Sequence, residues 1–193
     1  FTYTQQTHTT NVKRVYARER GQSFPETDGM ITDVPGICLV TSYADCVPLY
    51  FVDPVKKVIG LSHSGWRGTV GKIGKVTVEK MEEEFGCDPA DILGAVGPSI
   101  CQDCYEVSED VIKKFRENYD ENLWPEIFYQ KENGKYQLNL WKANESVFLE
   151  SGILPEHIAV TNVCTHCNPD ILFSHRTTGN ERGTLSAFLA LKK

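Results

Sequence analysis

Apolar and polar residues alternate along this chain in short segments, and their spacing predicts strands and helices in mixed order. Short β-rich runs predict strands over Thr9–Tyr16, Gly36–Thr41, Ile92–Val96, Ile158–Val163 and Thr184–Leu191, the last of which could also form a helix. Apolar positions at helical spacing predict helices over Gly68–Phe85, from Ser108 as N-cap to Tyr119, and over Leu138–Ser151. Gly86 and Gly152 are typical helix stops. This mixture without strict βαβ repeats predicts an α+β protein, with mixed sheets covered by helices.

A β-hairpin is predicted where two apolar runs, Val47–Val52 and Val58–Leu61, flank a turn that contains proline. If Asp53–Lys56 is the loop, Cys46 lies directly opposite His63, seventeen residues further along the chain. Opposed residues of an antiparallel pair hold their Cβ atoms about 4.5–5.5 Å apart. Cys46 and His63 could therefore share a metal ion or form a nucleophile–base pair. A purely structural interpretation, a buried cysteine beside a hydrogen-bonded histidine, stays open because short apolar runs support several registers.

Composition and charge narrow the classes of protein. The chain has 193 residues and a formal net charge of −6, and no linker-like stretch divides it, so one domain is expected. Acidic residues are interspersed among the basic ones, which predicts no nucleic-acid partner. No apolar run is long enough to span a membrane, and no signal peptide precedes the seven cysteines. Free thiols in a reducing cytoplasm are the expectation.

Several short motifs carry a resemblance to a known family. In chain order they are Gln6-Thr7-His8, Thr27-Asp28-Gly29, Ala44-Asp45-Cys46-Val47-Pro48, His63-Ser64-Gly65-Trp66-Arg67-Gly68, Gly97-Pro98-Ser99-Ile100, Tyr105-Glu106-Val107, Cys164-Thr165 and Phe173-Ser174-His175-Arg176. Together they resemble the YfiH/laccase-domain family, whose members are called multicopper polyphenol oxidoreductases, purine nucleoside phosphorylases or peptidoglycan editing factors. Two positions depart from the family pattern, His175 in place of a tyrosine and Glu181 before Arg182 in place of a glycine.

The resemblance implies a single domain over residues 1–193 with a layered α/β/β/α arrangement. Family members carry several dozen further residues before the Gln-x-His segment, so we expect that an N-terminal segment is missing here. The resemblance also implies a metal triad of His8, Cys46 and His63, with Cys46 and His63 as the catalytic pair. Two imidazoles and a thiolate are a normal catalytic zinc set that leaves a fourth position open. Copper could occupy the same ligands.

The implied activity is zinc-dependent phosphorolysis of adenosine, inosine and methylthioadenosine, with adenosine deamination as a side activity. Its partners would be a nucleoside and phosphate. For the phosphate we favour Arg67, at a glycine-rich helix start that could bind an anion, and then Arg176 and Arg182. A structural salt bridge is the alternative role for Arg67.

Three other functions stay open. Cys46 could be the nucleophile of a hydrolase with His63 as its base, acting on a peptidoglycan precursor. A copper-binding polyphenol oxidoreductase would fit one family name, but five histidines are too few for a laccase, whose copper centres need on the order of ten imidazoles. A metal-stabilised interaction domain without activity is the third.

Two other kinds of zinc site are disfavoured by the sequence. Cys101-x-x-Cys104 and Cys164-x-x-Cys167 lie nearly sixty residues apart, too far for a compact zinc ribbon, so we expect incidental pairs that can still pack near one another. The zinc deaminase signature is missing, because Ser64 and Gly65 follow His63 and Val163 precedes Cys164.

Overall fold

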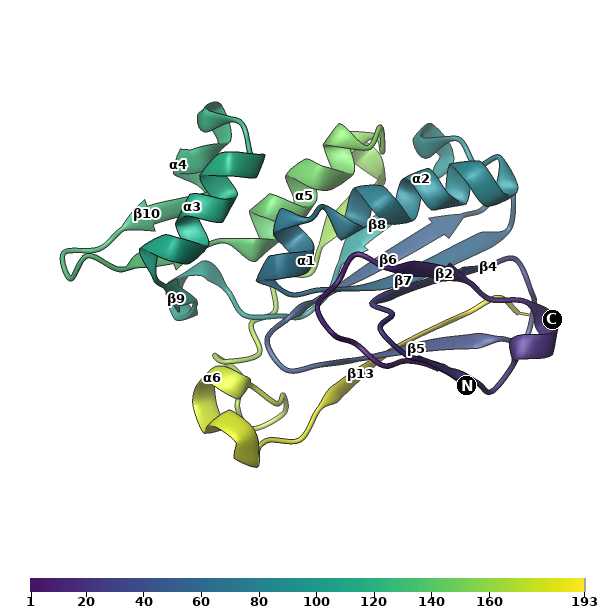
Figure 1. Ribbon diagram of the computed structural model, residues 1–193, viewed down its shortest axis with the longest axis horizontal. Helices are drawn as coiled ribbons and strands as arrows, with labels where there is room; N and C mark the ends of the chain where they lie inside the picture. Colours follow the sequence, from purple (N-terminus) through teal and green to yellow (C-terminus); the bar gives the residue numbers. More distant parts are fainter. Residues whose placement is uncertain (193) are drawn as a thin grey trace.

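The computed structural model describes residues 1–192, which form three β-sheets and six α-helices (Figure 1). The strands are β1 (Thr2–Thr4), β2 (Val12–Arg14), β3 (Ser23–Phe24), β4 (Gly29–Thr32), β5 (Cys38–Tyr43), β6 (Val47–Asp53), β7 (Val58–Ser64), β8 (Leu93–Val96), β9 (Glu106–Val107), β10 (Phe128–Gln130), β11 (Tyr136–Leu138), β12 (Ile158–Val160) and β13 (Leu185–Ala190). The helices are α1 (Trp66–Val70), α2 (Ile73–Phe85), α3 (Glu109–Asn118), α4 (Trp124–Ile127), α5 (Leu140–Glu150) and α6 (His175–Thr178).

The predicted hairpin, β6 and β7, forms the centre of a six-stranded mixed sheet with the order β12-β8-β6-β7-β4-β2. A second, four-stranded sheet has the order β13-β5-β1-β3, and a three-stranded sheet, β10-β11-β9, extends beside α3. The segment 184–191, which could have been helix or strand, is strand β13, paired with β5. The prediction of an α+β fold with mixed sheets and a central hairpin is confirmed.

The hairpin register differs from the predicted one by two residues. Asp53 pairs with Val58 and Pro48 pairs with His63, so Cys46 lies just before β6 and is not directly opposite His63. The reason is local: the Asp53 carboxylate accepts hydrogen bonds from the backbone N–H groups of Val55 and Lys56, which makes Asp53 the last strand residue. Because side chains alternate with period two, a shift by two keeps Cys46 and His63 on the same face.

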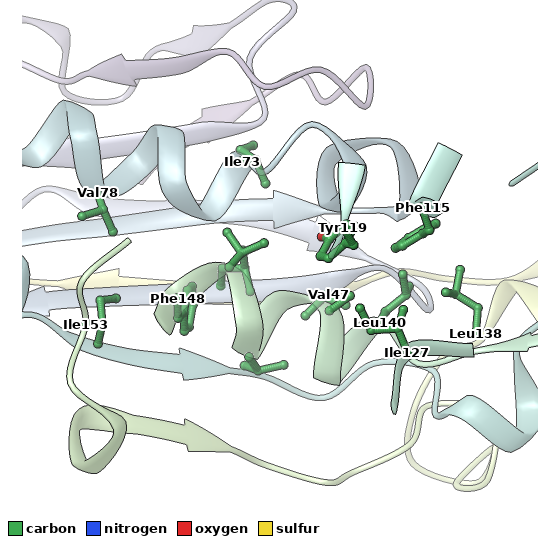
Figure 2. Packing of buried hydrophobic residues seen from close by; sticks show 14 of the residues in the cluster. Val47, Ile73, Val78, Phe115, Tyr119, Ile127, Leu138, Leu140, Phe148 and Ile153 are labelled. Carbon is green, nitrogen blue, oxygen red and sulfur yellow. The ribbon is translucent and has the colours of Figure 1, made fainter. Parts of the chain in front are cut away.

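Helices and the second sheet cover opposite faces of the six-stranded sheet. On one face α2 packs on β7 and α5 packs on β8 and β12 (Figure 1). Phe148 of α5, labelled in Figure 2, meets Phe51 of β6 with ring centroids 5.1 Å apart. On the other face Ile59 and Leu61 of β7 pack against the four-stranded sheet through Leu39. Residues 1–192 thus supply three layers of the expected α/β/β/α arrangement: helices, sheet and sheet.

The outer face of the four-stranded sheet carries exposed aromatic side chains. Tyr3, on β1, and Phe188, on β13, flank Val40 of β5, and the ring of Phe1 lies 5.8 Å from that of Phe188. The inner face, with Leu39 and Ala187, is buried. Period-two alternation therefore explains why this sheet is buried on one side only.

Two predicted helices differ from the pattern, one by a break and one by a later start. The helix expected over 68–85 is divided into α1 and α2, because Lys72 adopts left-handed backbone angles with φ +55°. A Cβ on Gly71 would lie 2.6 Å from the Thr10 side chain, so the break brings the backbone close to the β1–β2 loop. The helix expected from Leu138 begins at Leu140, since Leu138 closes strand β11. Gly86 ends α2 with φ +64°, as predicted. In residues 1–192 no helix has both the length and the apolar character needed to cross a membrane.

Candidate metal centre

Three side chains from separate segments converge at one end of the two large sheets. His8 lies in the loop between β1 and β2, Cys46 directly precedes β6, and His63 is on β7. Their ligand atoms all lie within 4.8 Å of one another, with Cys46 Sγ 4.0 Å from His8 Nε2. The site therefore contains the three residues that the sequence and its resemblance proposed as metal ligands.

The strand geometry explains why the centre opens toward a cavity. His63 shares a face of β7 with Leu61, and its ring lies 5.4 Å from that of Tyr43 on β5, so it sits between the sheets. A cavity of about 300 Å³ opens there, lined by Thr4, Gln6, His8, Ser42, Tyr43, Ala44, Cys46, His63, Arg182 and Thr184. His63 is buried and His8 is exposed, so the centre faces solvent from one side only. A small molecule can reach the ligand atoms through this cavity.

Asp28 organises two of the three ligands. Its fully buried carboxylate accepts a hydrogen bond from His63 Nδ1 at 2.9 Å. The same carboxylate accepts the backbone N–H groups of Thr7, His8 and Thr9, and the Thr9 hydroxyl, at 2.8–3.2 Å. It thereby fixes the loop that carries His8 and leaves His63 Nε2 as the free ring nitrogen. Asp28 belongs to the Thr27-Asp28-Gly29 motif, but the sequence indicates no role for it.

The backbone around the centre is specialised. His8 has φ +63° and Asp45 has φ +84°, in the left-handed region that non-glycine residues seldom adopt. A Cβ on Gly65 would lie 2.9 Å from the His8 ring and 3.0 Å from Cys46 Sγ. Only glycine leaves room there for both side chains. Gly65 belongs to the motif that begins at His63, but only the fold shows its role.

Electrostatics favour a thiolate at the centre. Burial by itself would raise the pKa of Cys46, but hydrogen bonds from His63 and His8 outweigh it and lower the pKa to about 6. Burial would lower the pKa of His63, but hydrogen bonds to Asp28 and Cys46 raise it to about 9. Burial likewise opposes ionisation of Asp28, while hydrogen bonds from His63 and Thr9 bring its pKa down to about 2. The metal-free centre is thus an ion pair between Cys46 and His63, backed by a carboxylate.

The donor set fits a metal ion. Two imidazole nitrogens and one thiolate within a few ångströms, with a carboxylate behind one imidazole, are the ligands and the outer partner that zinc and copper sites use. Three protein ligands beside an open cavity leave room for a further ligand from solution. His8, Cys46 and His63 would hold such an ion.

The three predicted phosphate-binding arginines lie in different positions. Arg182 lines the cavity, where its Nε donates to His175 Nδ1 at 3.2 Å. Arg176 and Arg67 are not among the cavity-lining residues. The Arg176 guanidinium lies 5.3 Å from the Tyr105 ring, and that of Arg67 lies 4.3 Å from the Trp66 ring.

Tyr105 lies within electrostatic range of Cys46 on one side and of Arg176 and Arg67 on the other. Burial raises the pKa of Tyr105 and the Cys46 thiolate adds to the effect, whereas Arg176 and Arg67 act in the opposite direction. Both cations are therefore within electrostatic range of the Tyr105 hydroxyl. The helix that contains Arg67 is only five residues long, so the long helix predicted at this anion site is absent, and phosphate binding by Arg67 stays a prediction.

Asp45 ties the late part of the chain to the centre, a role that the sequence did not reveal. Its carboxylate accepts the Thr165 hydroxyl and the Arg176 backbone N–H, each at 2.7 Å. These contacts span more than a hundred residues, so no local pattern signals them.

The fold and this centre define a class of protein: a layered α/β domain with a His₂Cys group of potential metal ligands at a cavity between two sheets. The family model described as "Multi-copper polyphenol oxidoreductase laccase" matches residues 1–192, and the chain belongs to this family.

Relatives carry names of nucleoside-processing enzymes, which marks the family as enzymatic. The chain is 35% identical to "Purine nucleoside phosphorylase YlmD" of Bacillus subtilis, over 99% of this chain and 70% of that protein. It is also 35% identical to "Adenosine deaminase RL5" of an unknown prokaryotic organism, over 92% of this chain and 70% of that protein. The crystal structure of the Bacillus licheniformis hypothetical protein YfiH superposes with a TM-score of 0.95, at 34% identity over 98% of this chain and 73% of that one.

Proposed function

We propose that this protein is a zinc-dependent purine nucleoside phosphorylase that acts on adenosine, inosine and methylthioadenosine and deaminates adenosine more slowly. The observation that carries the proposal is the convergence of His8, Cys46 and His63 beside a cavity of about 300 Å³. The names of the relatives supply the substrate class.

The proposed metal centre uses its residues in distinct roles. A bound zinc ion would supply a Lewis acid that polarises a substrate oxygen or activates water. His8, Cys46 and His63 would hold the ion, and Asp28 positions His63 through the hydrogen bond to its Nδ1. The buried carboxylate also offsets positive charge at the centre and makes His63 a more basic ligand, and a bound ion would displace the protons of the ligands.

Phosphorolysis needs an anion site near the glycosidic bond. A phosphate oxygen attacks the anomeric carbon, the bond to the purine nitrogen breaks, and the free base and ribose 1-phosphate leave. Arg182, which lines the cavity, would bind phosphate, and Arg176 and Arg67 would contribute positive potential from the Tyr105 side. The arginines would also offset the negative charge brought in by phosphate.

The test is chromatography of inosine and adenosine incubated with the protein, with and without phosphate. We expect hypoxanthine or adenine together with ribose 1-phosphate only when phosphate is present, and a slower conversion of adenosine to inosine. Arg182→Gln should raise the KM for phosphate more than the KM for inosine, with Arg20→Gln, on an exposed turn, as a matched control. Base release that ignores phosphate would contradict phosphorolysis.

A cysteine hydrolase is the second candidate function, and the ion pair at the centre favours it. Cys46, His63 and Asp28 are arranged as nucleophile, base and orienting carboxylate, with the pKa of Cys46 lowered to about 6. The substrate would be a peptidoglycan precursor peptide. Covalent trapping of Cys46 by such a substrate in metal-depleted protein, with phosphorolysis absent from the metal-loaded protein, would favour this function.

A multicopper oxidase is disfavoured by the arrangement of the histidines. Only His8 and His63 join a group of potential metal ligands among residues 1–192, and His157, His166 and His175 do not. Neither methionine lines the cavity, so the structure offers no thioether there as an axial ligand to a single copper ion.

A further inference from the structure

A second group of potential metal ligands lies outside the centre described above. We call it the four-cysteine cluster, and it consists of Cys101, Cys104, Cys164 and Cys167. The first pair lies in the connection between β8 and β9, and the second pair lies in the loop that follows β12. The fold joins the two connections through a parallel β-bridge between Ser99 and Cys164, which brings together pairs that are nearly sixty residues apart in sequence.

The sulfur positions match a single tetrahedral ion. All four Sγ atoms lie within 4.8 Å of one another, with Cys104 and Cys167 3.4 Å apart and Cys101 and Cys167 4.0 Å apart. A tetrahedral Zn(Cys)₄ site with Zn–S bonds of about 2.3 Å places its sulfurs about 3.8 Å apart. A disulfide requires about 2.05 Å, and all four cysteines are free.

The backbone around the cluster is arranged for a thiolate. The N–H groups of Cys101 and Cys167 both donate to Cys164 Sγ, at 3.3 and 3.4 Å. Such hydrogen bonds stabilise negative charge on sulfur, which a neutral thiol in a hydrophobic core does not need. The first Cys-x-x-Cys pair also forms a tight turn, in which the Cys104 N–H donates to the Cys101 carbonyl.

Apolar packing does not account for the cluster. Cys164 is buried, but Cys167 is exposed and Cys101 and Cys104 are only half-buried. Cys101 and Cys104 pack against the core that contains Cys164, but packing requires neither an exposed Cys167 beside them nor four sulfur atoms within 4.8 Å of one another. A bound ion gives all four a common partner.

We propose that the four-cysteine cluster binds one structural zinc ion with all four thiolates. Four protein ligands fill the coordination sphere, so this site has no position for substrate and serves to hold the fold. It joins the β8–β9 connection to the loop after β12, in a region where residues 161–184 form only short helical turns.

The site would act on the catalytic cavity through that loop. Thr165, next to Cys164, donates its hydroxyl to Asp45, and further along the same loop the Arg176 N–H donates to the other oxygen of that carboxylate. Asp45 directly precedes Cys46. An ion at the four-cysteine cluster therefore fixes one wall of the cavity without touching a substrate.

Elemental analysis of full-length protein purified under reducing conditions tests the proposal. The starting variant is Cys46→Ala, which disables the His₂Cys centre, so any remaining zinc reports on the cluster. We expect about one zinc per chain in this variant, and close to none when Cys104→Ser and Cys167→Ser are added. Cys38→Ser, on strand β5 away from the cluster, is the matched control and should leave the zinc content unchanged.

X-ray absorption on the zinc of Cys46→Ala keeps the proposal falsifiable even if the serine variants do not fold. The expected shell is four sulfurs at about 2.3 Å with no nitrogen or oxygen. Zinc-free Cys46→Ala, a shell that contains nitrogen or oxygen ligands, or disulfide-linked cysteines in non-reducing peptide mass spectrometry would each overturn it.

Discussion

The His₂Cys centre and the four-cysteine cluster are both groups of potential metal ligands, but the fold builds them in different ways. The first takes its residues from strand β7 and from segments that adjoin β1 and β6, it faces a cavity, and the buried carboxylate of Asp28 orients His63. The second takes its residues from two connections at the surface, and its sulfurs are oriented by backbone N–H groups. Three ligands at a cavity leave a position for chemistry, whereas four ligands close the coordination sphere.

The comparison also separates the energetic roles of the two sites. The framework strands around His63 are held by a hydrophobic core on both faces of the sheet, so the His₂Cys centre is preorganised without an ion. The segments of the four-cysteine cluster are connections with little regular secondary structure, joined to each other by a single β-bridge, so their order would depend more on the ion. Catalysis should therefore depend on the first site and local stability on the second.

The largest expected effect is the loss of activity on removing a ligand of the His₂Cys centre. Cys46→Ala should lower kcat/KM for phosphorolysis by about 1,000-fold, since a catalytic metal supplies several kcal/mol of charge stabilisation. Its melting temperature should stay near that of the unchanged protein, because the core around β6 and β7 remains. Activity that survives the substitution would place the chemistry elsewhere.

Metal removal from the four-cysteine cluster should have the next largest effect, on stability. At zinc concentrations about 100-fold above its dissociation constant, binding contributes about 2.7 kcal/mol to the free energy of unfolding. A chelator should therefore destabilise Cys46→Ala by about this amount in denaturant unfolding and leave Cys46→Ala/Cys104→Ser/Cys167→Ser unaffected. Equal chelator effects on the two proteins would show that the cluster does not bind the ion that stabilises the fold.

A smaller effect, on zinc affinity, is expected from substitution of Asp28, which contacts the ligand His63. Asp28→Asn keeps the shape but weakens the hydrogen bond to His63 Nδ1 and removes the negative charge, so zinc affinity at the His₂Cys centre should fall about 10–100-fold. Competition with a chromogenic chelator measures this zinc affinity. Asp33→Asn, at an exposed position, is the control, and equal affinities in both variants would refute the role of Asp28.

The smallest effect is a shift in a titration curve of metal-free protein. Alkylation of Cys46 by iodoacetamide should rise through about pH 6, because its thiolate is paired with His63 and accepts hydrogen bonds. Below that pH the thiol is protonated and labelling slows. Asp28→Asn should move the midpoint upward, since the imidazolium of His63 loses its carboxylate partner.

Cys87 is the internal reference for this titration. Burial and the neighbouring Asp53 carboxylate raise the pKa of Cys87 to about 12, so it should not label over the same range. Mass spectrometry of the labelled peptides separates the two cysteines. A Cys46 midpoint as high as that of an ordinary thiol would show that the ion pair does not form.

Local features of the site were readable from the sequence because side-chain alternation is a local property. The apolar runs of β6 and β7 predicted the hairpin, and the parity of their positions put Cys46 and His63 on one face although the register was off by two. The helix break at Lys72 was not predicted, because a 3.6-residue pattern continues across a single residue with left-handed backbone angles. His8 entered the ligand set only through the family resemblance.

The sequence by itself predicted the central hairpin and most of the longer strands and helices, since spacing along the chain encodes period and face. It did not predict the shorter elements, which are β1, β3, β4, β9, β10, β11, α4 and α6. Only the tertiary structure decided that Asp28 holds both histidine segments, that Gly65 leaves room for two ligands, and that four distant cysteines meet. These contacts join residues that no periodicity relates. Their proximity is set by the packing of sheets and loops across the whole chain, which local residue patterns do not specify.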